Sequence, residues 1–282
     1  MYNFMRNFWR VTMSQPAGLA AVAFVSLLAF LAVCAPLLFS GDPNQITENV
    51  MRAPSFAHPF GTDELGRDGL ASVVYGARVS LIVGLLAAAA ATLLGGLIGA
   101  FAGYRGGAFD LIVMRIAEIF QVLPTFILAA VIIALSRPGL PQVIIVIAVL
   151  AWPQTARLMR GEVMRIKQMD FVAAVRCLGI GDSAILLREI VPNSLAPVLA
   201  VGTLIVGQAI LLEASLGFLG LSSPEIVSWG RMLNSGQRFL FNAWWLSVFP
   251  GTAIFLTVLA FNLAGDALGA AMDPRRSGGE HR

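Results

Sequence analysis

Three carboxylic acids set in long apolar stretches are the first candidates for chemistry in this sequence: Glu118, Glu213 and Asp266. If these stretches cross a bilayer, an ionisable side chain there is costly and is a functional candidate, and a series of them could relay protons. The three acids stand at different positions along their stretches, which disfavours a continuous relay. We favour local pairing instead, for example between Glu118 and Arg115 three residues earlier.

A second polar group, close together in the sequence, consists of His58, Asp63, Glu64 and Asp68. Imidazole and carboxylate groups are metal ligands, so this cluster raises the question of a metal site. No helical i, i+4 pairing of ligands supports one. A single histidine among scattered carboxylates is typical of loop and helix-cap chemistry, and we expect no metal ion.

Nucleotide hydrolysis and enzyme catalysis find no support in the sequence. It lacks the phosphate-binding pattern G-x-x-x-x-G-K-[ST], and its only lysine, Lys167, follows Ile166 instead of glycine. No Ser/His/Asp, Cys/His or metal-ligand constellation is evident. We therefore assign no catalytic residue and expect no cofactor in this chain.

The elements that position these residues are apolar helices. Of the 282 residues only 12% are charged and 57% are hydrophobic, and the mean hydropathy is +0.80. A bilayer core about 30 Å thick needs about 20 helical residues, and the charge-free runs have that length. We predict an all-α integral membrane protein with about six transmembrane helices, at 19–39, 79–103, 119–136, 139–156, 194–212 and 243–265.

Only Arg137 and a Pro/Gly turn separate the third span from the fourth, which predicts a tight hairpin. Lys and Arg accumulate on the cytoplasmic side of short loops. With both termini inside, thirteen of the 19 basic residues lie there and six lie outside. This predicts a cytoplasmic segment at 1–18, a six-helix transmembrane domain at 19–270 and a cytoplasmic tail at 271–282. The net charge of +3 then reflects topology and gives no support for nucleic-acid binding.

The segment before the second span and the glycines within that span predict how this helix begins and how it packs. The segment 40–78 is expected on the outer face, and its residues 69–78 are expected to form a short helix leading into the span. Gly95, Gly99 and Gly103 recur every four residues, so they line one helix face and predict close packing against another helix.

The cytoplasmic loop 157–192 is longer than a hairpin needs. We expect Asp170 to cap a short helix over 171–178 and Gly179 to end it in the left-handed conformation. Asp182 or Ser183 would cap a second helix running to Val191, with Pro192 marking a boundary. Such a helical knob suits docking onto a soluble partner, although a basic amphipathic helix lying on anionic lipid explains the residues equally well.

The stretch DFVAAVRCLGIGDSAILLREIVPN resembles the cytoplasmic coupling motif of the inner-membrane permeases of ATP-binding-cassette importers, in the dipeptide, oligopeptide and nickel branch, with Ala174, Gly179 and Pro192 at matching positions. The resemblance extends to HPFGTDELGRD, GYRGGAFDLIVMR, EASLGFLGL, SWGRML and FNLAGDAL through MDPR, and so covers nearly the whole chain in order. One departure is Ala173, where the family usually has Glu. This change removes a capping-box bond and predicts a weaker cap without loss of docking.

The resemblance implies a type I ABC-importer transmembrane domain, of the C-type permease, in a bacterial inner membrane. It implies as partners a second related permease subunit, two ABC ATPase subunits that hold ATP and Mg, an extracytoplasmic solute-binding protein and membrane lipid. The residues it assigns to ATPase coupling are Asp170, Phe171, Ala173, Ala174, Arg176, Gly179, Asp182 and Pro192. Candidates for structural or gating roles are Asp63, Gly66, Arg67, Asp68, Arg115, Glu118, Glu213, Trp229 and Asp266.

The implied substrates are di- or oligopeptides, with nickel, glutathione-like compounds or another small solute as alternatives. Gln121, Gln154, Gln208 and Asn262 could line a pathway, but amides also stabilise helix contacts. A proton-coupled secondary transporter and a non-transporting membrane scaffold are the alternatives from other functional classes.

Overall fold

The computed structural model describes residues 16–39, 45–136, 139–222 and 226–272, and this part of the chain is helical with no named strand. Most of the two predicted terminal segments, and Arg137 and Pro138 of the predicted hairpin, lie outside the described residues. The helices are α2 (Pro16–Leu38), α3 (Gly69–Arg105), α4 (Gly107–Val122), α5 (Thr125–Leu135), α6 (Leu140–Lys167), α7 (Asp170–Cys177), α8 (Asp182–Ala184), the π-helix η1 (Ile185–Ile190), α9 (Val191–Phe218), α10 (Trp229–Gly236), the 3₁₀ helix η2 (Gln237–Phe239) and α11 (Trp245–Met272).

Five helical stretches in this part of the chain are long and apolar enough to cross a bilayer, and the bent pair α4 and α5 would make a sixth. The prediction of an all-helical membrane fold is confirmed. The span predicted at 119–136 is not one helix, because it falls on the end of α4 and on α5, which meet at 88°. Pro124 explains the break: a residue before proline is pushed out of the helical region, and Leu123 is extended at φ −76° and ψ 134°.

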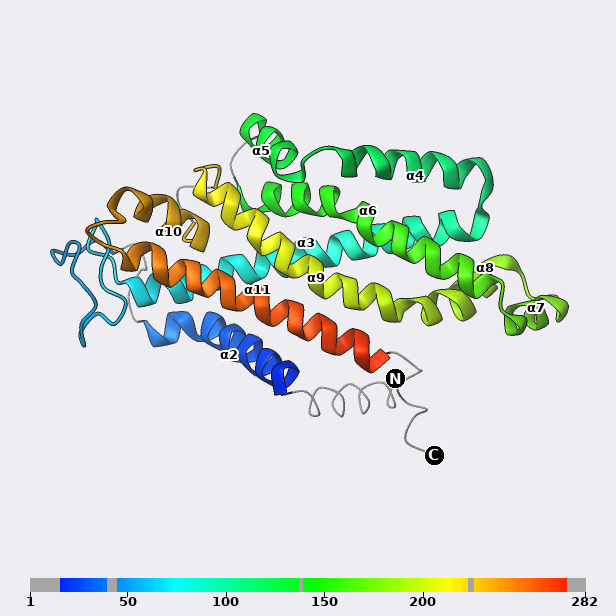
Figure 1. Ribbon diagram of the computed structural model, residues 1–282, viewed down its shortest axis with the longest axis horizontal. Helices are drawn as coiled ribbons and strands as arrows, with labels where there is room; N and C mark the ends of the chain where they lie inside the picture. The colour runs from blue at the N-terminus through cyan, green and yellow to red at the C-terminus, as the bar shows by residue number, and fades with distance from the viewer. Residues whose placement is uncertain (1–15, 40–44, 137–138, 223–225, 273–282) are drawn as a thin grey trace.

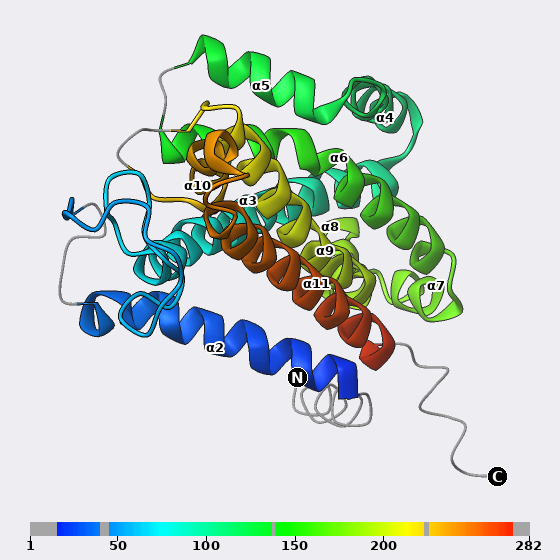
Figure 2. The same ribbon diagram turned by 60° about the vertical axis from the view of Figure 1, so that its left-hand side comes forward.

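The helices lie along one long axis (Figure 1). The loop formed by residues 45–68 and α10 lie at one end of the bundle, which we call the loop end. Helix α7 projects at the opposite end, which we call the α7 end. Helices α2 and α11 run along one side, and α4 and α5 lie on the other side of the central helices (Figure 2). The start of α2 and the end of α11 are directed toward the α7 end.

Helix α3 is the centre of the packing and lies against α6, α9 and α2. A Cβ on Gly99 would overlap the carbonyl oxygen of Ala156, and one on Gly103 would lie 2.8 Å from the carbonyl oxygen of Arg160. The predicted glycine face is therefore confirmed, and its partner is α6. The predicted helix over 69–78 is also confirmed, as the first turns of the continuous helix α3.

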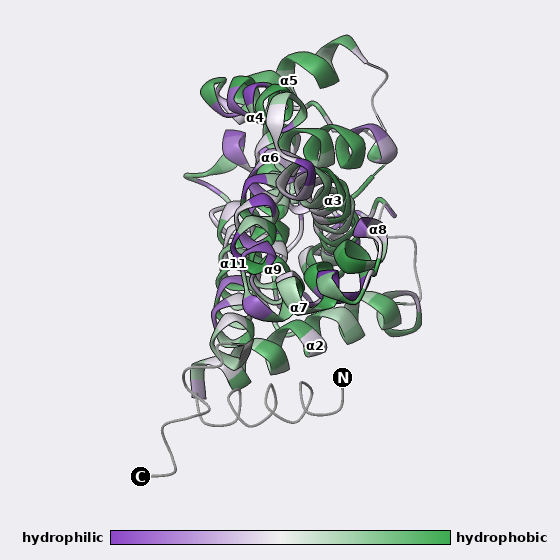
Figure 3. Cartoon of the chain, turned by 90° about the vertical axis from the view of Figure 1, so that its right-hand side faces the viewer, coloured by the Kyte–Doolittle hydropathy of each residue, from purple (hydrophilic) through white to green (hydrophobic). Residues whose placement is uncertain are grey.

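The outer faces are apolar, as lipid contact requires. Seen from the α7 end, α2 and α5 are almost wholly hydrophobic (Figure 3). Leu37 is 85% exposed and Leu135 is 86% exposed. Buried residues inside the bundle include many alanines, among them Ala87, Ala91 and Ala102. Small residues inside and large ones outside are typical of helices packed in a membrane.

Candidate functional site: the helical knob, the polar hollow and the loop end

Helix α7 is short and separate, and one of its side chains is buried against the bundle. Val172 is 0% exposed and packs in a cluster with Met159, Val163 and Ile166 of α6 and with residues of η1. Phe171 is 39% exposed and Leu178 is 78% exposed. Ala173, Ala174 and Arg176 also lie on exposed positions. The helix thus has one face held by the bundle and another, partly apolar face free.

The predicted capping of α7 by Asp170 is wrong. Met169 is the N-cap, no side chain caps this end, and Asp170 is the first residue of the helix. The sequence prediction placed the boundary one residue late. In the first turn, the carboxylate of Asp170 still interacts favourably with the helix dipole. Ala173 therefore removes no reciprocal bond, because no capping box is present.

The left-handed end of α7 at Gly179 is confirmed. Gly179 has φ +78°, and its N–H donates to the carbonyl oxygen of Arg176 at 3.0 Å. A Cβ at this position would meet nothing within 4 Å. Backbone conformation alone therefore requires glycine here.

The predicted second helix, ending before Pro192, is wrong. Residues 182–218 form one continuous helical stretch in which a π-turn, Ile185–Ile190, joins α8 to α9. Pro192 is the second residue of α9 and interrupts nothing, because the wide turn before it accommodates the missing N–H. Likewise α6 continues to Lys167, so only residues 168–181 separate the two long helices.

The predicted capping by Asp182 or Ser183 is wrong. The N-cap of α8 is Gly181, and no side chain accepts a capping hydrogen bond at this end. The hydroxyl of Tyr104, near the end of α3, donates to Asp182 Oδ1 at 2.5 Å. Arg176 Nη2 lies 4.0 Å from the same oxygen. Lys167 Nζ donates to the carbonyl oxygen of Tyr104 at 2.5 Å. Tyr104, which the sequence analysis missed, thus connects α3, α6 and α8 at the base of α7.

A second missed contact fixes the bent pair to the bundle. Arg160 of α6 binds Asp110 of α4 through two charge-assisted hydrogen bonds, Nε to Oδ1 at 2.5 Å and Nη2 to Oδ2 at 2.6 Å. A bidentate pair of this kind is strong and directional. It holds the start of α4 where Gly103 brings α3 close to Arg160.

An open hollow of about 700 Å³ lies between the bend of α4 and α5 and the long helices α6 and α9. Its polar lining includes Gln121, Gln154, Gln208 and Arg157, and Arg157 donates a hydrogen bond to the Gln121 side chain. Three of the four amides proposed for a pathway thus line one hollow. Asn262 does not; it lies beside Gly207, where α11 packs on α9.

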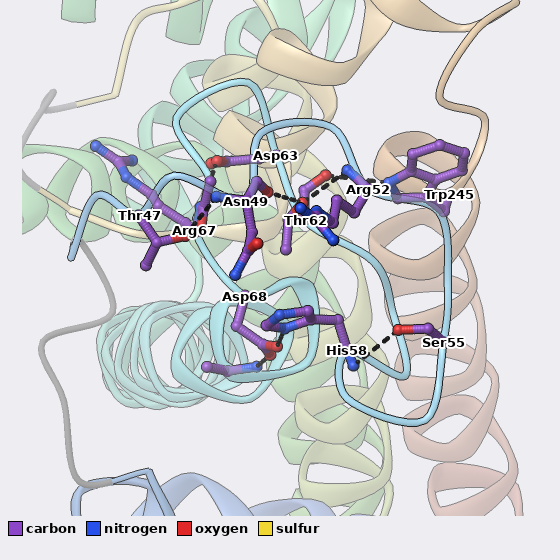
Figure 4. Close-up of polar contacts among 12 residues, drawn as sticks. Thr47, Asn49, Arg52, Ser55, His58, Thr62, Asp63, Arg67, Asp68 and Trp245 are labelled. Carbon is purple, nitrogen blue, oxygen red and sulfur yellow. Dashed lines mark hydrogen bonds and ion pairs between the residues drawn. The ribbon is translucent and has the colours of Figure 1, made fainter.

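Loop and cap chemistry is confirmed for two acids at the loop end (Figure 4). Asp63 Oδ1 accepts from the N–H groups of Leu65 and Arg67, both at 2.8 Å. Asp68 caps α3 by accepting from the N–H of Ala71 at 2.9 Å, and its other oxygen lies 2.8 Å from His58 Nδ1. The described residues contain no group of three or more His, Cys, Asp or Glu placed to hold a metal ion.

Gly66 and Trp229 hold the loop end together. Gly66 has φ +74°, and the Thr47 hydroxyl donates to its carbonyl oxygen at 2.5 Å. Trp229 is fully buried and donates from Nε1 to the carbonyl oxygen of Val73 at 2.9 Å. Trp245 similarly donates to the carbonyl oxygen of Thr62 at 3.2 Å. These bonds attach α10 and the loop to α3 and α11.

The three acids named first lie on three different helices and do not meet. The pairing of Glu118 with Arg115 is confirmed at 2.8 Å on the exposed side of α4. Glu213 is 2% exposed on α9 and accepts from the Ser80 hydroxyl at 3.1 Å, which ties α9 to α3. Asp266 is exposed on α11, with no ion pair among the described residues. This arrangement does not favour a proton relay.

Comparison with known proteins gives a consistent family. Residues 95–278 match the family described as "Binding-protein-dependent transport system inner membrane component". The dipeptide transport system permease protein DppC of Alkalihalophilus pseudofirmus is 39% identical over 273 residues, which are 95% of this chain and 90% of the relative. The glutathione transport system permease protein GsiD of Pectobacterium atrosepticum is 37% identical over 273 residues, 96% of this chain and 91% of the relative.

The fold agrees with a solved structure. An inward-facing conformation of the MetNI methionine ABC transporter superposes with a TM-score of 0.60 at 20% identity, over 72% of this chain and 96% of the matched chain. The likeness supports the type I importer fold.

Proposed function

Because this chain belongs to the family of inner membrane components of binding-protein-dependent transport systems, we propose that it is the translocation subunit of an ATP-driven importer of di- or oligopeptides. The chain is a multi-pass inner membrane protein and not the ATPase of its complex. It works with an ATPase and a binding protein. In the proposed assembly it pairs with a second related permease and with two ATPase subunits that hold ATP and Mg, and both termini and the α7 end face the cytoplasm.

The observation that carries this proposal is the free face of α7. Phe171 and Leu178 expose apolar surface at the two ends of a short helix that Val172 fixes to the bundle. An exposed apolar patch on a rigidly attached element is typical of a protein interaction site. Val172 packs on α6, and the contacts at Tyr104 connect α3, α6 and α8 at the base of this helix. A partner that moves α7 therefore moves the helices around the polar hollow.

The hollow supplies the proposed substrate path. Its amides offer both hydrogen-bond donors and acceptors, and Arg157 adds a positive charge. A peptide backbone presents donors, acceptors and a terminal carboxylate, which fits such a lining. Uptake of a labelled dipeptide by cells with and without the chain tests the assignment. ATP-dependent uptake that needs the chain supports it, and uptake that persists after ATP depletion contradicts it.

We expect Leu178→Ser to lower substrate-stimulated ATP hydrolysis by the assembled complex about tenfold, as loss of a central apolar contact does at protein interfaces. The melting temperature of the isolated subunit should stay unchanged, because this side chain is 78% exposed in the chain alone. Leu240→Ser, at an exposed leucine of the loop end, is the matched control and should leave hydrolysis unchanged. Equal hydrolysis in both variants would contradict docking through α7.

We expect Gln208→Leu to raise the KM for dipeptide uptake about fivefold, since one hydrogen bond contributes about 1 kcal/mol. Basal ATP hydrolysis should not change, because Gln208 lies in the hollow and away from α7. Asn262→Leu is the control, an amide outside the hollow. A larger KM change in the control than in Gln208→Leu would place the path elsewhere.

A further inference from the structure

A small pocket at the loop end has a lining that the transport role does not explain. It lies between residues 63–72 and α10, and it holds a volume of about 50 Å³. A cavity of this size has room for a few atoms, more than a single water needs and much less than a peptide. Among its polar lining residues are Asp63, Glu64, Arg67, Ser72, Arg231 and Ser235.

Two guanidinium groups, those of Arg67 and Arg231, line this pocket. Arg67 Nε is buried with no hydrogen-bond partner, and Arg231 Nη1 donates to the carbonyl oxygen of Ile226 at 3.3 Å. Within the described part of the chain, neither arginine has a carboxylate within 4.0 Å. Both residues are partly buried, and a charge removed from water without a partner is costly; two like charges facing one cavity add repulsion.

The charge environment of Arg231 agrees with this geometry. Burial, and after it the neighbouring Arg67 guanidinium, lower the pKa of Arg231 below its usual value. An anion between the two groups would remove both penalties, because it neutralises the repulsion and accepts the free N–H bonds.

The two acids of the pocket do not serve as that anion. Asp63 uses Oδ1 to accept two backbone N–H bonds of its own loop. Glu64 lines the cavity without an ion pair in the described structure. A carboxylate in the same lining opposes a bound anion, which gives Glu64 a defined place in a test.

We propose that this pocket binds a carboxylate group, held between Arg67 and Arg231. The planar guanidinium fork matches a carboxylate in shape and hydrogen-bond geometry. The hydroxyl groups of Ser72 and Ser235 lie in the same lining and can donate to it. The group belongs either to a free small acid or to the terminus of a peptide, and both offer the same two oxygens.

Calorimetric titration of acetate into the full complex in nanodiscs, at constant ionic strength, tests the site. Wild type should bind saturably, and Arg67→Gln and Arg231→Gln should each weaken binding about tenfold or more, since a bond to a charged group contributes the most among hydrogen bonds. Arg238→Gln, an exposed arginine beside α10, is the matched control and should bind like wild type. Arg231→Lys keeps the charge and should retain part of the affinity.

The variant Glu64→Gln distinguishes a bound carboxylate ligand from the alternative that Glu64 itself is the counter-ion of the two arginines. If Glu64 competes with the ligand, its removal tightens acetate binding. If Glu64 is instead the counter-ion of the two arginines, its removal lowers the melting temperature of the acetate-free complex and leaves acetate binding absent, which overturns the proposal. Unsaturable binding in wild type, or wild-type affinity for acetate in both Arg67→Gln and Arg231→Gln, overturns it as well.

A dipeptide and the same dipeptide with an amidated terminus identify the source of the carboxylate. Binding of the free dipeptide alone assigns the site to peptide termini, and binding of acetate without the dipeptide assigns it to free small acids. Binding of neither overturns the proposal. Dipeptide uptake by the same variants is a separate measurement, so loss of acetate binding with normal uptake leaves the import function in place.

Discussion

Gly99→Ala is expected to destabilise the helix bundle by about 3 kcal/mol, at the upper end for overpacked interiors. The added Cβ would overlap the carbonyl oxygen of Ala156 and lie 2.9 Å from its Cα. These are backbone atoms of α6, so no side-chain rotation relieves the clash, and the two helices have to separate. The melting temperature of the purified complex, and its yield from membranes, measure the effect.

Gly96→Ala is the matched control on the same helix. A Cβ at Gly96 meets nothing within 4 Å, and alanine is the better helix former, so this variant should be as stable as wild type or slightly more so. The difference between the two variants isolates helix packing from helix propensity. Equal melting temperatures would contradict the close contact of α3 with α6.

Gly179→Val is expected to reduce substrate-stimulated ATP hydrolysis and uptake about tenfold while the complex still assembles in the membrane. The left-handed conformation at φ +78° costs a residue with a Cβ about 1 to 2 kcal/mol, and β-branching makes it worse. The variant therefore relaxes the turn and changes the direction in which α7 presents Phe171. Hydrolysis in reconstituted vesicles, with and without substrate, measures this coupling.

Gly181→Val provides the control for Gly179→Val. Gly181 lies two residues further along, also has open space around it, and has φ −68° in the extended region that valine readily adopts. The Gly181→Val variant should show the same substrate-stimulated ATP hydrolysis as wild type. Normal coupling in Gly179→Val would mean that the orientation of α7 is not needed for docking.

The sequence predicted those features that depend on local pattern. Charge-free runs located the apolar helices, and four-residue spacing identified the face of Gly95, Gly99 and Gly103. The positive φ of Gly179 followed from its place after a short amphipathic segment. The bend at Leu123 and Pro124 was missed, although its signal was present, because counting charges does not register a proline inside an apolar run.

Contacts between distant residues could not be predicted from one sequence. Tyr104 and Asp182 are 78 positions apart, and Asp110 and Arg160 are 50 apart. Only the packing of α3, α6 and α9 brings them together. The same is true of the hollow: the residue types of Gln121, Gln154 and Gln208 were visible, but their common orientation depends on three separate helices. The capping role predicted for Asp170 was wrong because helix α7 begins one residue earlier than predicted.

The π-turn at Ile185–Ile190 makes residues 182–218 a single rod of 37 residues, about 55 Å long at the usual helical rise. The rod rests on α3 partway along, where Gly84 receives the side chain of Ile210 and Gly202 faces Thr92. Both contacts hold the middle of the rod against α3. Asp182 and the hollow-lining residues Gln208 and Ser215 therefore belong to one uninterrupted helical stretch, so a displacement at the α7 end is passed to the hollow through a single element.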